Sequence, residues 1–251
     1  MDNNYFKEWF SKEQALKREI QLIFLNLIFK SKNNSIVFKG GTALDLFLNS
    51  GRFSEDLDFD ILTKDNLSEI DEAIEKFANS GKYTIFNNWE NERNINNSFV
   101  RYYLKISSDE YENVIDFIID CSVDKPFLNP DNHILNYKDS IIKIPVMDPQ
   151  EIVAKKVSAI LSREKARDLY DLYYLVIVKN VKVNMKYVYM KCKKQFSSAK
   201  PQDYSFDLFE KKVKGLKSKW IELEPLLNNY KIYNYSEVSG ELLRMFRLLN
   251  S

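Results

Sequence analysis

FKGGTALDLFLNSGRFSEDLDFDI, residues 38–61, is the stretch that decides the expected fold. The apolar run that leads into it, Ile36-Val37-Phe38, predicts a short buried strand, which Gly40-Gly41-Thr42 interrupts before an apolar helical stretch. A strand, a tight glycine turn and a helix in this order are typical of a backbone cradle for phosphate groups. Glycines also occur at such turns for backbone reasons alone. The turn therefore indicates a phosphate site only in combination with the acidic residues on its C-terminal side.

The second half of this stretch alternates acidic and apolar side chains. Asp56, Asp58 and Asp60 fall on one face of an extended strand, and the residues between them fall on the core face. Repulsion among these carboxylates is relieved when a divalent cation binds. Asp56 and Asp58, about 6.6 Å apart along a strand, can flank two Mg²⁺ ions about 3.5–4 Å apart, whereas Asp60 is too distant to share the same ion. The alternative is a solvated acidic strand edge.

Composition limits the chemistry that the chain can carry out. Its 251 residues are 45% hydrophobic, which is sufficient for a folded core, and the net charge of +1 means that any basic surface must be local. The single histidine, His133, lies in a polar stretch that we expect to be a loop, so histidine triads and histidine-rich zinc sites are excluded. Catalysis must then use carboxylates and lysines, which favours phosphoryl or nucleotidyl transfer.

Cysteine usage and hydropathy indicate the compartment. Cys121 and Cys192 are far apart and lack metal-binding spacing, which fits a reducing environment. The N-terminal residues lack the pattern of a secretion signal, and the most hydrophobic stretch, residues 20–29, is too short to span a bilayer. We therefore expect a cytoplasmic protein with no membrane-spanning segment.

The glycine turn and the acidic strand together resemble the signature of polymerase-β-type nucleotidyltransferases, in which an apolar strand and a Gly-[Gly/Ser] turn precede an Asp-x-Asp motif. The resemblance implies an α/β (α+β) fold with a mixed twisted sheet flanked by helices. It also implies a third carboxylate on a neighbouring strand. Residues 101–106 and 114–119 predict a β-hairpin, in which Asp116 and Asp120 share a face. We favour Asp116, because it lies inside the apolar run; the alternative for either is an exposed strand position.

A second informative region starts at residue 148. Residues 148–151, Asp-Pro-Gln-Glu, predict a helix start with an N-cap and a proline at the first position. Lys156 falls inside the apolar arc of that helix, where it either reaches toward a triphosphate or extends along the edge of the arc. In the following helix, Asp168 lies at the border of the apolar face, whereas Asp171 points away from it.

Residues 148–175, DPQEIVAKKVSAILSREKARDLYDLYYL, and the opening stretch together resemble the two blocks that mark AbiEii/AbiGii toxins, the nucleotidyltransferase half of type IV toxin–antitoxin and abortive phage infection systems. The resemblance implies magnesium-dependent transfer of a nucleoside monophosphate from an NTP to an acceptor, expected to be tRNA, and a separately encoded antitoxin as partner. Alternatives are a protein acceptor, or a non-catalytic nucleotide-binding module.

The resemblance also implies roles for individual residues. Lys156 and Asp168 are the later catalytic pair, and Lys156 also contacts the nucleotide. The phosphate-binding residues are Gly40, Gly41, Thr42 and Ser54, and the ligands of Mg²⁺ (or Mn²⁺) are Asp56, Asp58 and Asp116.

Two domains are expected, a nucleotidyltransferase core over residues 1–145 and a mostly helical part over 146–251 that contributes to the active-site cleft. The last helix, near residues 240–249, is expected to pack in the core through Leu242, Leu243, Phe246 and Leu249. Beyond Val178, lysines alternate with aromatic residues, which predicts either a nucleic-acid surface or a solvated helical face. These residues are Lys179, Lys182, Lys186, Tyr187, Tyr189, Lys191, Lys193, Lys194, Phe196, Lys200, Tyr204, Lys211, Lys212, Lys214, Lys217 and Lys219.

Overall fold

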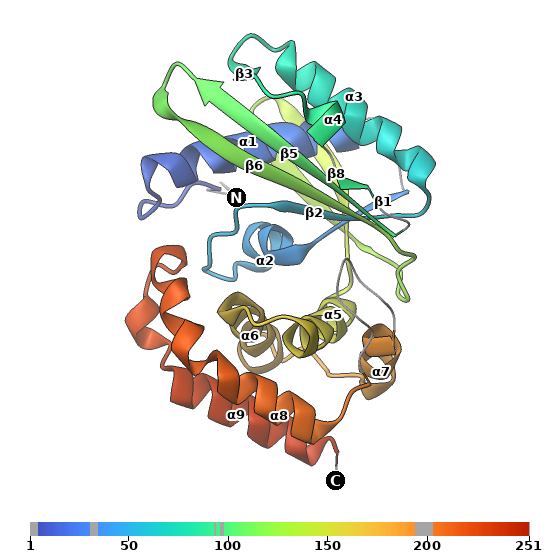
Figure 1. Cartoon of the computed structure of the whole chain (residues 1–251), viewed down its shortest axis with the longest axis vertical. Helices are drawn as coiled ribbons and strands as arrows, with labels where there is room; N and C mark the ends of the chain where they lie inside the picture. Colours follow the sequence, from blue (N-terminus) through green and yellow to red (C-terminus); the bar gives the residue numbers. More distant parts are fainter. Residues whose placement is uncertain (1–4, 31–34, 93, 96–97, 194–202, 251) are drawn as a thin grey trace. The chain divides into compact units, whose positions relative to one another are not determined.

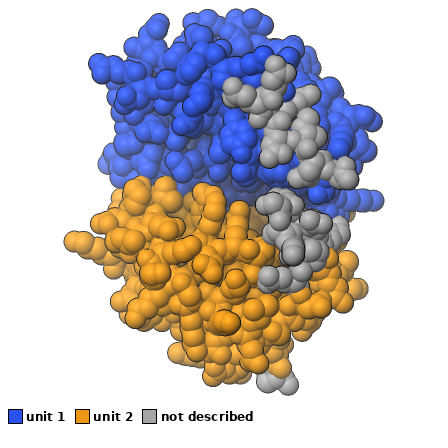
Figure 2. All heavy atoms as spheres, in the orientation of Figure 1, with its two compact units in different colours: residues 1–48, 53–126, 130–147 blue, residues 49–52, 127–129, 148–251 orange. Residues whose placement is uncertain are grey.

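The computed structural model describes residues 5–30, 35–92, 94–95, 98–193 and 203–250. The chain divides into two compact units, coloured separately in Figure 2. Unit 1 comprises residues 1–48, 53–126 and 130–147, and unit 2 comprises residues 49–52, 127–129 and 148–251. The short segments 49–52 and 127–129, which the sequence places in the N-terminal domain, thus belong to unit 2.

Unit 1 is built on a mixed sheet, as the sequence predicts (Figure 1). In the described residues the strand order is β3-β5-β6-β2-β1-β8-β7, and β4 also pairs with β5. The pairs β2–β6 and β1–β8 are parallel, and the other pairs are antiparallel. The strands are β1 (Ile36–Lys39), β2 (Leu57–Ile61), β3 (Tyr83–Ile85), β4 (Asn94–Ile95), β5 (Phe99–Ser108), β6 (Tyr111–Val123), β7 (Asp131–Tyr137) and β8 (Ser140–Val146).

The helices of unit 1 pack on this sheet through aromatic side chains. Phe24 lies on the helix of residues 12–29, Phe77 on the helix of residues 67–78, and Phe117 on β6. The Phe24 ring centroid is 4.6 Å from that of Phe77 and 5.5 Å from that of Phe117. A capping box at Ser11 and Gln14 starts the first helix, as predicted. The helical elements are α1 (Lys12–Phe29), α2 (Gly40–Leu48), the 3-10 turn η1 (Lys64–Asn66), α3 (Leu67–Ala78) and α4 (Trp89–Glu92).

Alternation along the strands decides which side chains face this core. Leu57, Phe59 and Ile61 of β2 are fully buried, which confirms the predicted apolar face. Full burial of one such side chain contributes about 1.5–3 kcal/mol. The predicted hairpin is also confirmed, although its strands β5 and β6 are longer than expected. His133 does not lie in a loop as predicted: it is in β7, and its ring centroid is 5.0 Å from that of Phe47.

Unit 2 is mostly helical. Asp148 caps its first helix by accepting the backbone N–H of Gln150 at 2.8 Å, and Pro149 occupies the first turn, as predicted. Leu242 and Phe246 of the last helix are buried as predicted, whereas Leu249 follows the helix end and is exposed. The elements are α5 (Pro149–Ser162), α6 (Ala166–Tyr173), the π turn η2 (Tyr174–Val178), α7 (Met185–Lys193), α8 (Phe206–Gly215), the 3-10 segments η3 (Leu216–Leu226) and η4 (Tyr230–Ile232), and α9 (Tyr235–Leu248).

Hydrogen bonds explain why two short segments belong to unit 2. The hydroxyl of Tyr170 donates to the carbonyl of Ser50 at 2.7 Å, and that of Tyr174 donates to the carbonyl of Asn49 at 2.6 Å. These bonds fasten residues 49–52 to α6 and η2. Residues 49–52 therefore belong to unit 2, although they lie only a few residues before β2 of unit 1.

A buried ion pair fastens the other segment. Glu151 of α5 accepts the backbone N–H groups of Phe127 and Leu128 at 2.8 and 3.1 Å, and its second oxygen lies 2.6 Å from Lys191 Nζ. Lys191 and Glu151 are both fully buried. One lysine of the basic C-terminal region is therefore a core residue. In the described part of the chain, no helix is both long and apolar enough to cross a membrane.

Candidate active site

Four charged residues form one continuous row across the sheet of unit 1. Asp58 of β2 pairs directly with Asp120 of β6, Arg101 of β5 is the partner of Asp120, and Lys39 of β1 is the partner of Asp58. Residues in register on neighbouring strands point to the same face, with about 4.8 Å between strands. Two carboxylates therefore lie side by side, with a cation at either end of the row.

The strand register places Asp120, rather than the favoured Asp116, next to Asp58. Asp116 lies four residues earlier on β6, opposite Lys105, whose Nζ is 3.1 Å from its carboxylate. The Asp116 side chain is 76% exposed, whereas Asp120 is buried. The physical reason is the parallel pairing of β2 with β6, which brings the end of the apolar run, rather than its middle, next to Asp58.

Electrostatics in this row reflect two carboxylates in close proximity. Burial raises the pKa of Asp120 above its ordinary value; Arg101 opposes this, and the neighbouring Asp58 adds to it. Arg101 binds Asp120 through two N–H···O bonds of 2.6 Å. Burial alone would lower the pKa of Lys39, but Asp60 and Asp58 outweigh it and hold that pKa above its ordinary value. The ion pair that Lys39 itself forms is with Asp60.

The glycine turn shapes the space around Asp58. Gly40 begins α2 with a φ of +77°, in the left-handed region that favours glycine. A methyl group added to its Cα would collide with the Asp58 carboxylate. The absence of a side chain at Gly40 is therefore what lets this carboxylate lie against the N-terminus of α2.

Replacing Gly40 with alanine is expected to destabilise unit 1 and to displace Asp58. The positive φ costs about 1–3 kcal/mol for alanine, and the collision adds about 1–3 kcal/mol. Gly81→Ala is the matched control, because Gly81 has a φ of +79° and nothing within 4 Å of an added Cβ. Urea unfolding measures both variants; equal losses would show that the contact with Asp58 is unimportant.

Thr42 holds the loop before β2. Its hydroxyl bonds to that loop, whereas the sequence predicted a contact with phosphate. Its side chain is fully buried, and Oγ1 donates to the carbonyl of Asp56 at 2.6 Å. Ser54 is also buried, and its carbonyl accepts from Gln21 Nε2 at 2.8 Å. Thr42 and Gln21 thus fix the backbone that leads into Asp56, while Gly41 is buried beside Thr42 in α2.

Unit 2 contains a second group of charges, here called the unit-2 charge cluster: Arg52, Lys156, Arg163, Asp168 and Asp171. The Nζ of Lys156 is 2.9 Å from Asp168 and 2.6 Å from Asp171. Arg163 binds Asp168 at 2.8 and 3.0 Å, and Arg52 binds Asp171 at the same two distances. Both aspartates are completely buried. The structure therefore brings together Lys156 and Asp168, the pair singled out in the sequence.

The cluster keeps its two carboxylates ionised. Burial by itself would raise the pKa of Asp168, but Lys156 and Arg163 outweigh it and hold that pKa well below its usual range. Burial likewise opposes ionisation of Asp171, and Arg52 and Lys156 lower its pKa below the ordinary value. Each aspartate accepts bonds from two cations, which is the condition under which buried charge is tolerated.

Sequence reasoning missed Arg52 and misplaced Asp171. Periodicity put Asp171 on the side away from the apolar face of its helix, but α6 is buried on nearly all sides. Because a buried carboxylate needs a cationic partner, burial of Asp171 would have been the signal to look for an arginine such as Arg52. Its partner could not be identified from spacing, because 119 residues separate Arg52 from Asp171.

A comparison with protein families decides the identity. Residues 22–219 match the family described as nucleotidyl transferase AbiEii toxin, type IV toxin–antitoxin system. The chain belongs to the AbiEii family. It is accordingly a nucleotidyltransferase of the type IV toxin–antitoxin class, as the two sequence blocks predict. No curated protein sequence matches the chain.

Solved structures show the same fold. JHP933 from Helicobacter pylori is 22% identical with a TM-score of 0.59, covering 95% of this chain and 92% of that chain. A second H. pylori structure is 24% identical with a TM-score of 0.59 and covers 95% of each chain. The MenT4 nucleotidyltransferase toxin of Mycobacterium tuberculosis H37Rv is 17% identical with a TM-score of 0.54, covering 93% of each chain.

The carboxylates of this AbiEii protein suit a magnesium ion. Mg²⁺ is usually held by one or two carboxylates together with substrate phosphates, rather than by a complete protein cage. Asp58 and Asp120 supply two hard oxygen donors in register, with Asp56 just before β2. Among the described residues, no three His, Cys, Asp or Glu side chains form a ready-made metal site.

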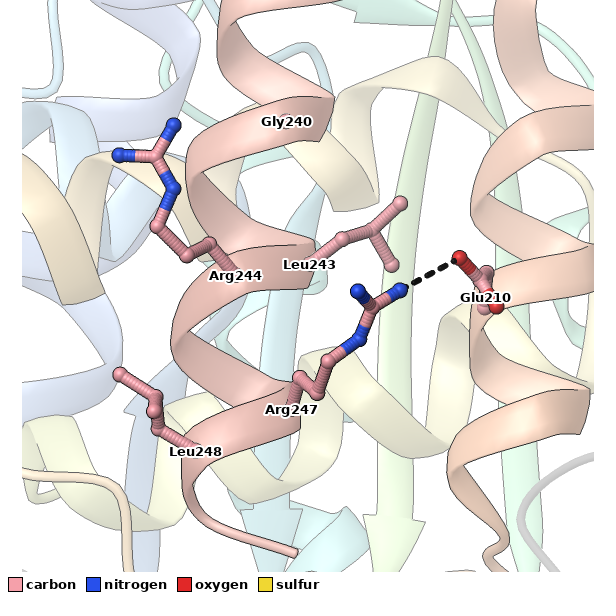
Figure 3. A pocket seen from close by; sticks show the side chains of 6 residues that line it. All are labelled: Glu210, Gly240, Leu243, Arg244, Arg247 and Leu248. Atoms are coloured by element: carbon pink, nitrogen blue, oxygen red, sulfur yellow. Dashed lines mark hydrogen bonds and ion pairs between the residues drawn. The ribbon is translucent and has the colours of Figure 1, made fainter. Parts of the chain in front are cut away.

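Unit 2 also contains a cavity and the basic C-terminal region. A cavity of about 310 Å³ is lined by Glu210 of α8 and by residues of α9. Arg247 lies 3.3 Å from Glu210, and the two side chains point toward one another (Figure 3). None of the predicted site residues lines the cavity. Of the basic region, Lys194, Phe196 and Lys200 lie outside the described residues. The nucleic-acid surface predicted there stays a prediction.

Proposed function

We propose that this AbiEii protein transfers a nucleoside monophosphate from an NTP to the end of an RNA acceptor, with tRNA as the first candidate, and that the reaction requires Mg²⁺ or Mn²⁺. The supporting observation is the pairing of Asp58 with Asp120 in register, beside a glycine turn that a side chain would obstruct. Two adjacent carboxylates at a helix N-terminus suit a site for a triphosphate and its cation.

The reaction joins an acceptor oxygen to the α-phosphorus and breaks the bond from that phosphorus to the bridging oxygen, so that pyrophosphate leaves. A bound divalent cation would supply charge neutralisation at phosphorus and activation of the attacking oxygen. In our proposal Asp58, Asp120 and Asp56 hold that cation, and the N-terminus of α2, at Gly40 and Gly41, receives phosphate oxygens. Protein groups thus mainly position the reactants and offset charge.

Lys156 and Asp168 are proposed as the later catalytic pair of the family. In the structure they form an ion pair, and Asp171 also binds Lys156. These two carboxylates fix the position of the Lys156 ammonium. Their anchoring partners are Arg52 and Arg163. Contact of Lys156 with the nucleotide is part of the proposal. We also propose a cytoplasmic location and a cognate antitoxin that limits the growth arrest.

Transfer of label from each α-³²P-labelled NTP to total tRNA and to protein tests this function. We expect label on tRNA with one or a few of the nucleotides, lost in EDTA and restored by Mg²⁺. Asp58→Asn is the inactive control, because it removes the charge of a proposed metal ligand. The variant is expected to fold, since the Asp58 side chain is partly exposed and asparagine has nearly the same size. Label on protein alone would contradict the RNA acceptor, and absence of both label and NTP binding would contradict the proposal as a whole.

A further inference from the structure

One face of the outer part of the sheet carries exposed aromatic rings. Along β5, alternate side chains such as Val100 and Tyr102 are buried against the core. The residues that alternate with them, Phe99, Arg101 and Tyr103, therefore project from the opposite face. Tyr103 is 39% exposed, although large aromatic side chains are usually well buried. Phe99, on the same face, is half-buried.

Phe86 extends this face beyond β5. Its backbone N–H donates to the carbonyl of Lys105 at 3.2 Å, one residue past the paired Ile85 and Ile106. Alternation then puts Phe86 on the same face as Lys105. The Phe86 side chain is 52% exposed. We call this surface the β5 platform; it consists of Phe86, Phe99, Arg101, Tyr103 and Lys105.

Two hydrogen bonds of Asn87 fasten the platform at its edge. The side-chain amide of Asn87 donates to the carbonyl of Tyr103 at 2.9 Å, and its oxygen accepts the backbone N–H of Lys105 at 2.8 Å. The Asn87 side chain thus forms two hydrogen bonds with the backbone of β5, just beyond the end of β3. A preorganised surface loses little conformational entropy on binding a ligand.

The composition of the platform suits nucleotides. The guanidinium carbon of Arg101 is 5.4 Å from the ring centroid of Phe99 and 5.9 Å from that of Tyr103. Exposed rings on a sheet stack nucleobases, and the interleaved cations contact phosphates, without requiring a particular sequence. Arg101 also binds Asp120, so that the platform is continuous with the carboxylate row.

The order of strands indicates which reactant occupies this side. The glycine turn follows β1, the two carboxylates lie on β2 and β6, and the platform lies on β5, so that the strand order is β1-β2-β6-β5. In an in-line displacement, the attacking and leaving oxygens stand on opposite sides of phosphorus. With the triphosphate at the glycine turn, an acceptor held on the β5 side lies across the carboxylates from the leaving group.

We propose that the β5 platform binds the terminal bases of a single-stranded RNA acceptor by stacking on Tyr103 and Phe86. This inference rests on the proposed function, because the acceptor side is defined by the carboxylates. It assigns to an exposed sheet face the task of holding the acceptor end next to Asp120, whichever NTP is used.

Equilibrium binding of a fluorescein-labelled single-stranded RNA that ends in CCA tests the proposal, measured by anisotropy in the Asp58→Asn background without NTP. Loss of one stacked base is expected to raise Kd roughly five- to a hundredfold. Tyr103→Ala and Phe86→Ala should each show this loss, whereas Tyr103→Phe should retain binding. Ile141→Ala is the matched control, because Ile141 is a 74% exposed apolar residue on β8, across the sheet.

Two parallel measurements separate this inference from the proposed function. Binding of a fluorescent NTP analogue should be unchanged in Tyr103→Ala and Phe86→Ala. Unchanged RNA affinity in both variants, or no RNA binding by the parent, would overturn the platform even if label transfer occurs. RNA binding that depends on Tyr103 and Phe86 would support the platform even if the parent chain with Asp58 intact transferred no label.

Discussion

Asp120→Asn is expected to lower the rate of nucleotide transfer by about 10²–10³-fold, while Asp116→Asn changes it by less than about twofold. A bound cation provides several kcal/mol of transition-state stabilisation, which sets the size of the first effect. Asp120 lies in register with Asp58, whereas Asp116 is 76% exposed and pairs only with Lys105. The two variants make the same chemical change on one face of the same strand, so that position alone distinguishes them.

The comparison requires that both variants fold, which urea unfolding followed by circular dichroism establishes. Asp120→Asn weakens the bidentate pair with Arg101, whose side chain is 35% exposed. Partly exposed ion pairs contribute about 1 kcal/mol or less, so a modest shift is expected. A transfer rate that falls for Asp116→Asn and not for Asp120→Asn would show that the strand register does not define the site.

Asp171→Ala is expected to reduce the stability of unit 2 by about 3–5 kcal/mol, because it leaves Arg52 and Lys156 buried with one carboxylate fewer. The Arg52 and Asp171 side chains are 2% and 0% exposed. Urea unfolding at pH 7 measures the loss. Glu164→Ala serves as control: its side chain is 52% exposed and lies 3.5 Å from Lys219, and removal should cost less than about 1 kcal/mol.

A double-mutant cycle shows whether the pair itself carries this loss. Arg52→Ala should destabilise unit 2 by a similar amount, and the double variant should lose less than the sum of the two. Strict additivity would mean that the two side chains act independently, contrary to their bidentate contact at 2.8 and 3.0 Å.

The same variant should lose its effect in acid. The pKa of Asp171 is lowered in the folded chain, so its contribution is complete above the pKa of an unfolded aspartate, about 3.9. That contribution is lost as the pH falls through the lower folded value. The stability difference between the parent chain and Asp171→Ala should therefore be constant near neutrality and narrow below about pH 4.

Local sequence was sufficient for the elements that carry the site. The helix start at Asp148 and the apolar face of β2 follow from capping and alternation, which act over a few residues. Strand β1 was also expected to end at Gly40, where a positive φ explains the residue type, although the helix begins at Gly40 rather than after Thr42. Each of these features depends on residues that are close together in the chain, so a single sequence is enough to predict it.

Long-range pairings could not be obtained in this way. The choice between Asp116 and Asp120 depends on the register of β2 against β6, and strands from distant parts of the chain fix that register only through the folded core. The pairing of Arg52 with Asp171 is of the same kind. Both determine which charges meet, and both required the structure.

The most direct test of the account is Mn²⁺ binding, measured by electron paramagnetic resonance in the presence of a non-hydrolysable NTP analogue. The account predicts that the parent chain and Asp116→Asn bind the ion with similar affinity, and that Asp58→Asn and Asp120→Asn bind it at least about tenfold more weakly. Equal affinity in all four proteins would contradict the claim that the neighbouring carboxylates of β2 and β6 form the metal site of this nucleotidyltransferase.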